Sequence, residues 1–482
     1  MNLHFKSAAE IAKLIREREV SAVDALEQFL ARIEKYNPRL NAIVWLDADG
    51  ARERARAADA ALDKGEIWGP LHGVPMTIKE SYNVAGSPTT WGDPKLKDNV
   101  TATSAIAVER LKKAGVVLFG KTNVPLMLAD NQSYNAIYGT TNNPWDVSRT
   151  PGGSSGGSAT AIAAGLTGLD AGSDIGSSIR SPAHFCGVFG LKSTWGVATP
   201  KGQALPNSFS YSDLSVIGPL ARSAEDLEIA FDVMAGPDEI DGTAWTVALP
   251  ACNAASLKDF RVAVKLSDPN CEVETAYVDK LQGLVDALAR RGATVKEAEP
   301  QIDTTHSHEV YLTLLRAATS SRVTDADIER WRKAQETLGI GTNRYLDMLL
   351  RGSILPHREW LRLNNERHGL RRTFAAFFED YDVLLCPVGA SAAPPHNHEG
   401  ETWQRTITVN GKSLPSTNHL FWAGYATLVF LPATTGPLGT IGSGLPVGYQ
   451  AIAASGRDRT AIAFSRAVET EIGGFVPPPG FD

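Results

Sequence analysis

The chain has 482 residues, of which 43% are hydrophobic and 21% charged, and its formal net charge is −7 at pH 7. These values are typical of a globular protein with a large core, and the acidic balance argues against a nucleic-acid or anionic-membrane partner. No run of about 18 apolar residues is present to span a membrane, and residues 1–20 lack the apolar segment of a signal peptide. The four cysteines are scattered without metal-ligand spacing, so we expect free thiols in a reducing, cytoplasmic compartment.

The first 68 residues predict three helices. The first begins at a capping box that Ser7 opens, and the second follows Ser21, with apolar residues at helical spacing in both. The third, rich in alanine and arginine, covers residues 50–64.

From residue 69 the pattern changes to alternating helices and strands. Apolar runs at 76–80 and 116–121 predict buried strands, with a helix at 105–114 between them. A further strand–helix–strand unit covers residues 260–296. This alternation predicts an α/β fold, with a central mixed β-sheet covered by helices on both faces.

The stretch from Arg149 to Arg180 contains two glycine–serine turns, at 152–157 and 174–180. A helix of small residues and a short strand, at 166–171, are expected between them. Glycines free the backbone and serines supply hydroxyls, so the pattern predicts a nucleophile beside N–H groups that bind an oxyanion. A flexible Gly/Ser linker is the alternative, which the helix pattern and the apolar flanks disfavour.

The remaining segments extend the same organisation. Residues 304–378 predict helices, 382–387 a buried strand, 388–417 a long surface loop, and 460–472 a terminal helix. No internal repeat or long linker divides the chain.

Three side chains are the main catalytic candidates: Lys79, Ser154 and Ser178. Lys79 ends a strand, where it is either a surface lysine with a buried stem or a buried base whose pKa is lowered. A serine nucleophile needs a neighbouring base. None of the ten histidines lies near a G-x-S-x-G elbow with an acidic partner, which favours a lysine-based triad over a histidine-based one.

Several motifs together resemble the amidase signature family. In chain order they are Gly69 to Pro75 leading to Lys79, Gly120 to Asn123, Asn143 to Trp145, Gly152 to Ser158, Asp174 to Pro182, Phe185 to Lys192 and Leu445 to Gly448. The resemblance covers most of the chain. It implies the amidase signature fold in a single domain, 1–482, with an N-terminal helical layer (1–68), a catalytic core (69–195) and a variable helical segment (304–378).

The same resemblance implies a Ser-Ser-Lys triad without a metal or cofactor. Ser178 would be the nucleophile, and Ser154, after a cis Gly153–Ser154 bond, would relay its proton to Lys79. The implied oxyanion hole consists of the backbone N–H groups of Ile175, Gly176, Ser177 and Ser178. Asp174 and Arg180 flank this turn, and we expect them to form an ion pair that supports the oxyanion hole. Gly153 would also support the site, and Leu128 and Ser154 would contact the substrate.

Two residues depart from the family pattern. Ser177 stands where the family usually has glycine, and Glu80 stands where aspartate usually follows the lysine. We expect neither to abolish activity, because Ser177 would contribute only its backbone N–H.

Substrate preference in such proteins comes from variable segments, here 195–215, 304–360 and 400–440. Their aromatic residues are Trp195, Phe209, Tyr211, Phe421, Trp422 and Tyr425. If they line the pocket, the small-molecule substrate is an apolar or aryl amide, an anilide or a carbamate. If they belong to the core, they say nothing about substrate.

Two other functions stay open. One is the A subunit of a glutamine-dependent tRNA amidotransferase, for which Arg351 and Arg358 are poorly suited as a glutamine clamp. The other is a non-catalytic binding protein with the same fold. Family members are often dimers, so analogy alone implies a homodimer.

Overall fold

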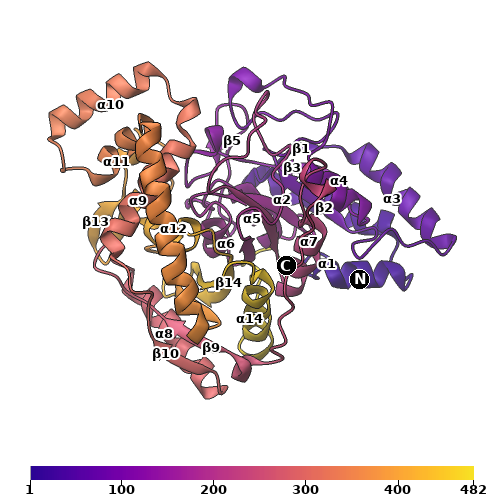
Figure 1. Cartoon of the computed structure of the whole chain (residues 1–482). Coiled ribbons are helices and arrows are strands. Elements are labelled where there is room, and N and C mark those ends of the chain that lie inside the picture. The colour runs from indigo at the N-terminus through magenta and orange to yellow at the C-terminus, as the bar shows by residue number, and fades with distance from the viewer. Residues whose placement is uncertain (1, 482) are drawn as a thin grey trace.

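A mixed sheet of eight strands runs through the middle of the molecule (Figure 1). The computed structural model describes residues 2–481. In spatial order the strands are β10 (Thr294–Glu297), β9 (Arg261–Val264), β11 (Val383–Pro387), β15 (Pro446–Ile452), β14 (Ala433–Thr440), β7 (Phe189–Lys192), β8 (Val216–Ala221) and β6 (Asp170–Asp174). β10, β9 and β11 pair in parallel, and the other neighbours are antiparallel. The predicted α/β class with a mixed sheet is confirmed.

Helices pack against this sheet in two groups. α5 (Gly156–Ala163) and α6 (Arg180–Cys186) contact each other, and α6 also contacts β14 and β15. α7 (Ala224–Met234) and α14 (Asp458–Glu471) form a second contacting pair, on β8 and β14. α8 (Thr275–Arg290) packs on β10 and β11.

A smaller sheet carries the N-terminal part of the chain. Its order is β1 (Ile43–Leu46), β3 (Val117–Thr122) and β2 (Pro75–Lys79), and β2 and β3 are parallel. The helices α1 (Ala8–Arg16), α2 (Ala22–Leu40), α3 (Ala48–Asp63) and α4 (Ile106–Lys113) belong to this half. The Thr77 N–H donates to the Leu169 carbonyl at 3.2 Å, which places β2 beside the start of β6. Strand β1 was not predicted from the sequence.

The C-terminal half adds a group of helices on the opposite side of the molecule from α3 (Figure 1). They are α9 (Thr304–Ala318), α10 (Asp325–Leu338), α11 (Arg344–Ser353), α12 (His357–Asp380) and α13 (Leu420–Thr427). The remaining strands form two short hairpins: β4 (Tyr134–Asn135) with β5 (Gly139–Thr140), and β12 (Thr406–Val409) with β13 (Lys412–Pro415).

Two local predictions were wrong. The strand expected at 166–171 begins only at Asp170, because Gly165 and Gly168 lie in the turn that leaves α5. The loop expected at 388–417 is not simply a surface loop. Residues 388–393 are buried, and the second hairpin lies within it.

Candidate active site

Lys79 ends β2, a strand that is buried over its whole length. Its side chain is fully buried, and its Nζ lies 2.7 Å from Ser154 Oγ, 2.9 Å from Ser155 Oγ and 3.0 Å from Ser173 Oγ. Burial lowers the pKa of Lys79 from 10.5 to about 7, although nearby Asp174 and Asp170 act in the opposite direction. Of the two interpretations left open by the sequence, the structure therefore selects the buried amine.

Ser154 follows a cis peptide bond, Gly153–Ser154, as the family resemblance implied. The backbone at Gly153 runs against the segment 130–132, and a Cβ there would lie 2.4 Å from the Asp130 carbonyl oxygen. Only glycine fits this approach, so the packing of the two segments fixes where the Ser154 hydroxyl points.

Ser178 lies in the turn between β6 and α6. Its carbonyl accepts a hydrogen bond from the Ser155 N–H at 3.1 Å, which holds the two glycine–serine turns side by side. The residue keeps 7% of its surface exposed, and its hydroxyl makes no hydrogen bond within residues 2–481. The Ser178 hydroxyl is therefore not engaged by another described residue.

The turn from Asp174 to Arg180 is organised by one carboxylate. Asp174 accepts hydrogen bonds from the N–H groups of Ser177 and Ile179, both at 3.0 Å. The Ser177 N–H therefore already has an acceptor, and its role as an oxyanion donor stays a prediction. The N–H groups of Ile175, Gly176 and Ser178 donate to no acceptor in the described part of the chain.

Asp174 also forms the ion pair expected with Arg180. Both side chains are fully buried, with Arg180 Nη2 2.8 Å and Nε 3.0 Å from the carboxylate. Burial alone would raise the pKa of Asp174, but the charge and hydrogen bonds of Arg180 outweigh it and hold the pKa at about 2. Arg180 Nη1 further donates to the Ala423 carbonyl and to Gln450 Oε1, at 3.1 and 2.7 Å.

Ser177 has an unusual environment for a serine. Its φ is +74°, in the left-handed region that favours glycine. Its hydroxyl is fully buried and has no hydrogen-bond partner among the described residues. The departure from glycine at this position therefore has a conformational cost that the sequence alone did not reveal.

Apolar side chains face the same turn from the C-terminal half. A Cβ at Gly176 would lie 3.2 Å from Leu420, 3.8 Å from the Tyr311 hydroxyl and 4.0 Å from Leu315. The Tyr311 hydroxyl donates to the Ile175 carbonyl at 3.0 Å. α9 and α13 thus form a wall beside the turn.

Leu128 lies two residues before Asp130, whose carbonyl borders Gly153. Its φ is +57° and that of Met127 is +52°, and Arg322 donates to the Met127 carbonyl. A cavity adjoins this segment. It is lined by residues 130–132, by Pro394 and Pro395 and by His419, among others. Substrate contact by Leu128 stays a prediction.

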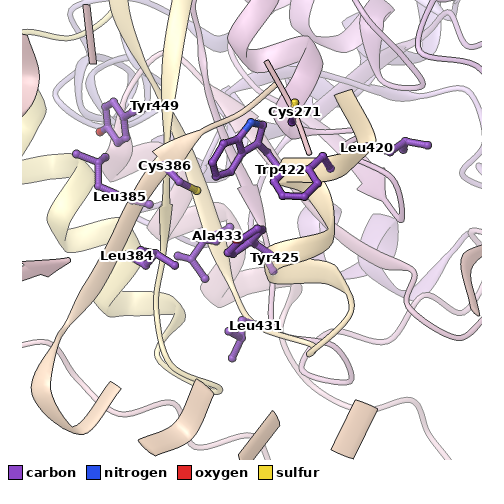
Figure 2. Packing of buried hydrophobic residues seen from close by; sticks show 14 of the residues in the cluster. Cys271, Leu384, Leu385, Cys386, Leu420, Trp422, Tyr425, Leu431, Ala433 and Tyr449 are labelled. Atoms are coloured by element: carbon purple, nitrogen blue, oxygen red, sulfur yellow. The ribbon is translucent and has the colours of Figure 1, made fainter. Parts of the chain in front are cut away.

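The predicted pocket aromatics divide into two groups. Trp422 and Tyr425 pack in the core with Leu384 and Cys386 of β11 (Figure 2), and Phe421 is buried beside them. The other three, Trp195, Phe209 and Tyr211, are exposed. For Trp422 and Tyr425 the core alternative is correct.

Sequence reasoning missed two residues that contact the lysine. Ser155 lies within the motif Gly152 to Ser158, and Ser173 directly precedes the motif that begins at Asp174, but nothing in the spacing distinguished them. No group of three or more metal-binding side chains occurs within residues 2–481, and no helix among them could cross a membrane.

Comparison with known proteins places the chain in a family. The Amidase family profile matches residues 24–462. An indoleacetamide hydrolase of Bradyrhizobium diazoefficiens is 33% identical over 97% of this chain and 86% of its own. The A subunit of a glutamyl-tRNA(Gln) amidotransferase from Moorella thermoacetica is 31% identical over 97% of each chain. The structure of a bacterial aryl acylamidase superposes with a TM-score of 0.82 over 98% of this chain and 97% of its own, at 24% identity, which shows the shared fold.

Proposed function

Since the chain belongs to the amidase family, whose hydrolases act on amide C–N bonds, we propose that Ser178 is its nucleophile and that Ser154 and Lys79 relay its proton. One observation supports this assignment most strongly. The Lys79 amine is buried 2.7 Å from the Ser154 hydroxyl, and its pKa is about 7, so much of it is neutral at physiological pH.

The proposed reaction has two halves. Neutral Lys79 accepts a proton from Ser154, Ser154 accepts one from Ser178, and the Ser178 oxygen bonds to the amide carbon. The N–H groups of Ile175, Gly176 and Ser178 stabilise the oxyanion. The C–N bond then breaks, and the proton returns through Ser154 to the leaving amine. Water hydrolyses the acyl-enzyme by the same relay and restores Ser178.

The proposed substrate is a small apolar or aryl amide, an anilide or a carbamate. The wall that Leu315, Leu420 and Tyr311 form beside the oxyanion turn is largely apolar, which suits such a group. The indoleacetamide hydrolase relative is named for a small amide that carries an aromatic ring, which agrees with this proposal.

Glutamine hydrolysis, as in the A subunit of an amidotransferase, is the second candidate, because a relative with that name matches along the whole chain. Arg351 and Arg358 are both exposed, so neither suits a buried glutamine clamp. A non-catalytic binding protein is the third candidate, and the buried contact between the Lys79 amine and the Ser154 hydroxyl argues against it.

One experiment separates the three. The purified protein is given p-nitroanilides, aryl carbamates, fatty amides and glutamine, and acylation of Ser178 is followed by mass spectrometry. We expect turnover of anilides or carbamates and an adduct that Ser178→Ala abolishes. Turnover of glutamine alone would favour the amidotransferase role. Hydrolysis that survives Ser178→Ala would refute the nucleophile.

A further inference from the structure

Asp170, at the start of β6, has an environment that the proposed mechanism does not use. It is fully buried, and its Oδ2 accepts hydrogen bonds from the Thr77 hydroxyl at 2.7 Å and from the Thr122 hydroxyl at 3.4 Å. Its Oδ1 is buried and has no partner among the described residues. A buried carboxyl with one oxygen unpartnered is rare without a reason.

Asp170 and Lys79 lie in neighbouring layers of side chains, which are set two residues apart along β2 and β6. On β2, Thr77 and Lys79 are two residues apart and share a face of the strand. On β6, Gly172 faces Ser155, since a Cβ there would lie 2.6 Å from Ser155 Oγ, and Asp170 is two residues earlier on the same face.

Helix α5 repeats this layering. Ser155 contacts Lys79, and Ser158, about one turn later, lies 2.9 Å from the Thr122 hydroxyl that reaches Asp170. Since the Thr77 hydroxyl contacts Asp170 and Thr77 lies two residues before Lys79, the rise of the strand gives a spacing on the order of 6 Å between the two layers.

We propose that Asp170 is a positioning residue for the reaction, which acts through Lys79 by setting the pH at which that amine becomes a base. The inference rests on the proposed function, in which Lys79 is the base. An ionised carboxylate at this distance favours the protonated amine, so Lys79 stays charged and inactive to a higher pH than it would alone. A neutral carboxyl does not stabilise the protonated amine, so Lys79 becomes a base at a lower pH.

The electrostatics of the two groups fit this role. Burial raises the pKa of Asp170 to about 7, while its hydrogen bonds and Lys79 oppose the rise, so both groups titrate in the same range. Two buried groups this close share their protons as a pair.

Other charged groups near the pair are already engaged. Asp174 is held by Arg180, and Glu80 accepts hydrogen bonds from the N–H groups of Thr90 and Trp91. Tyr82 donates its hydroxyl to the Gly172 carbonyl, and burial together with Asp170 raises the pKa of that hydroxyl. Among the described residues, Asp170 is therefore the carboxyl near Lys79 that has neither a cationic partner nor a backbone N–H donor.

The test is the pH profile of kcat/KM for Asp170→Asn, which removes the charge and keeps the shape. We expect the acid limb to move to lower pH by about one unit or more. A shift of this size follows from the Coulomb energy of two charges at this distance in an effective dielectric constant near 20. Thr77→Val is a second variant. It removes the hydroxyl that stabilises the ionised carboxylate, so its limb should move in the same direction by less.

Asp226→Asn is the matched control. Asp226 is also a fully buried carboxylate, but it accepts hydrogen bonds from the N–H groups of Ala8 and Ala9 at the start of α1. This control should lower the melting temperature and leave the limb in place.

Two results overturn different claims. If Asp170→Asn or, should that variant not fold, Thr77→Val keeps the wild-type limb while Lys79→Ala is inactive, the role of Asp170 is refuted and the triad stands. If Lys79→Ala keeps near wild-type activity, the proposed triad itself is refuted.

Discussion

Lys79 and Arg180 are both fully buried basic side chains of the active site, and their surroundings differ. Lys79 contacts only hydroxyl and carbonyl groups, and no carboxylate lies within 4.0 Å of its amine among residues 2–481. Arg180 lies against Asp174, with two of its nitrogens bonded to the carboxylate. The two residues are equally buried, but only Arg180 contacts a carboxylate.

The difference shows how two basic side chains take different roles, Lys79 as a base and Arg180 as a structural ion-pair partner. A buried lysine without a counter-ion loses its proton near neutral pH, because desolvation disfavours the charged form. Arginine stays charged, so it must be paired, and the pair holds the turn that carries the oxyanion donors. Each of the following predictions alters one side of this contrast.

Replacing the base should have the largest effect. In Lys79→Ala the proton of Ser154 has no acceptor, so we expect kcat/KM to fall at least about 10⁴-fold. The control is Lys121→Met, since Lys121 is another buried lysine and donates to the Pro88 carbonyl instead of a serine. It should stay within about tenfold of wild type. Steady-state kinetics on an anilide measures both, and a similar loss in both variants would contradict the distinction.

Replacing Arg180 should mainly reduce the stability of the folded protein. Arg180→Met leaves the Asp174 carboxylate buried without its partner, so the free energy of unfolding should drop by about 3–5 kcal/mol. The exposed pair between Arg18 and Asp63 is the control, and Arg18→Met should cost at most about 1 kcal/mol. Urea denaturation measures both. An equal cost would mean that burial does not set the strength of the Arg180 pair.

Acid should act on Lys79 and on the Arg180–Asp174 ion pair in different pH ranges. The pKa of Lys79 is about 7, so kcat/KM should fall toward tenfold per unit below that pH as the amine becomes charged. The pKa of Asp174 is lowered from 3.8 to about 2, so its contribution to stability is present above about pH 4 and is lost as the pH falls toward 2. Activity should therefore disappear while circular dichroism still reports a folded protein. Simultaneous loss of both would refute this separation.

The smallest effect is expected at Ser177, between the nucleophile and the ion pair. Ser177→Gly relieves the left-handed conformation and removes an unpartnered hydroxyl, so stability should rise by about 1–2 kcal/mol. Asn207 also has a positive φ but is exposed, and Asn207→Gly should change stability by less than about 0.5 kcal/mol. A destabilised Ser177→Gly would show that the serine is needed.

Local patterns in the sequence were sufficient for much of the fold. The strand at Lys79 and the helix between the serine turns depend on neighbouring residues, whose periodicity the sequence displays directly. The contact between Lys79 and Ser154, 75 residues apart, followed only from the family resemblance. Residue types and spacing alone left the environment of Lys79 undecided.

The substrate side was harder to predict, because it depends on contacts between distant segments. Helix α13 is apolar on every side, so its sequence could not show that Leu420 faces the oxyanion turn while Trp422 enters the core. The sequence also could not show that Asp174 accepts the hydrogen bond of the Ser177 N–H, because this contact depends on the exact backbone path of the turn.

The contacts of Arg180 have a consequence for biosynthesis. Its guanidinium reaches Ala423, Thr427 and Gln450, so the turn that carries Ser178 is fully braced only when the last strand of the sheet is in place. A nascent chain emerges from the ribosome N-terminus first. It would therefore display Lys79, Ser154 and Ser178 long before that strand is synthesised. During translation, hydrolytic competence would thus be among the last properties that this polypeptide acquires.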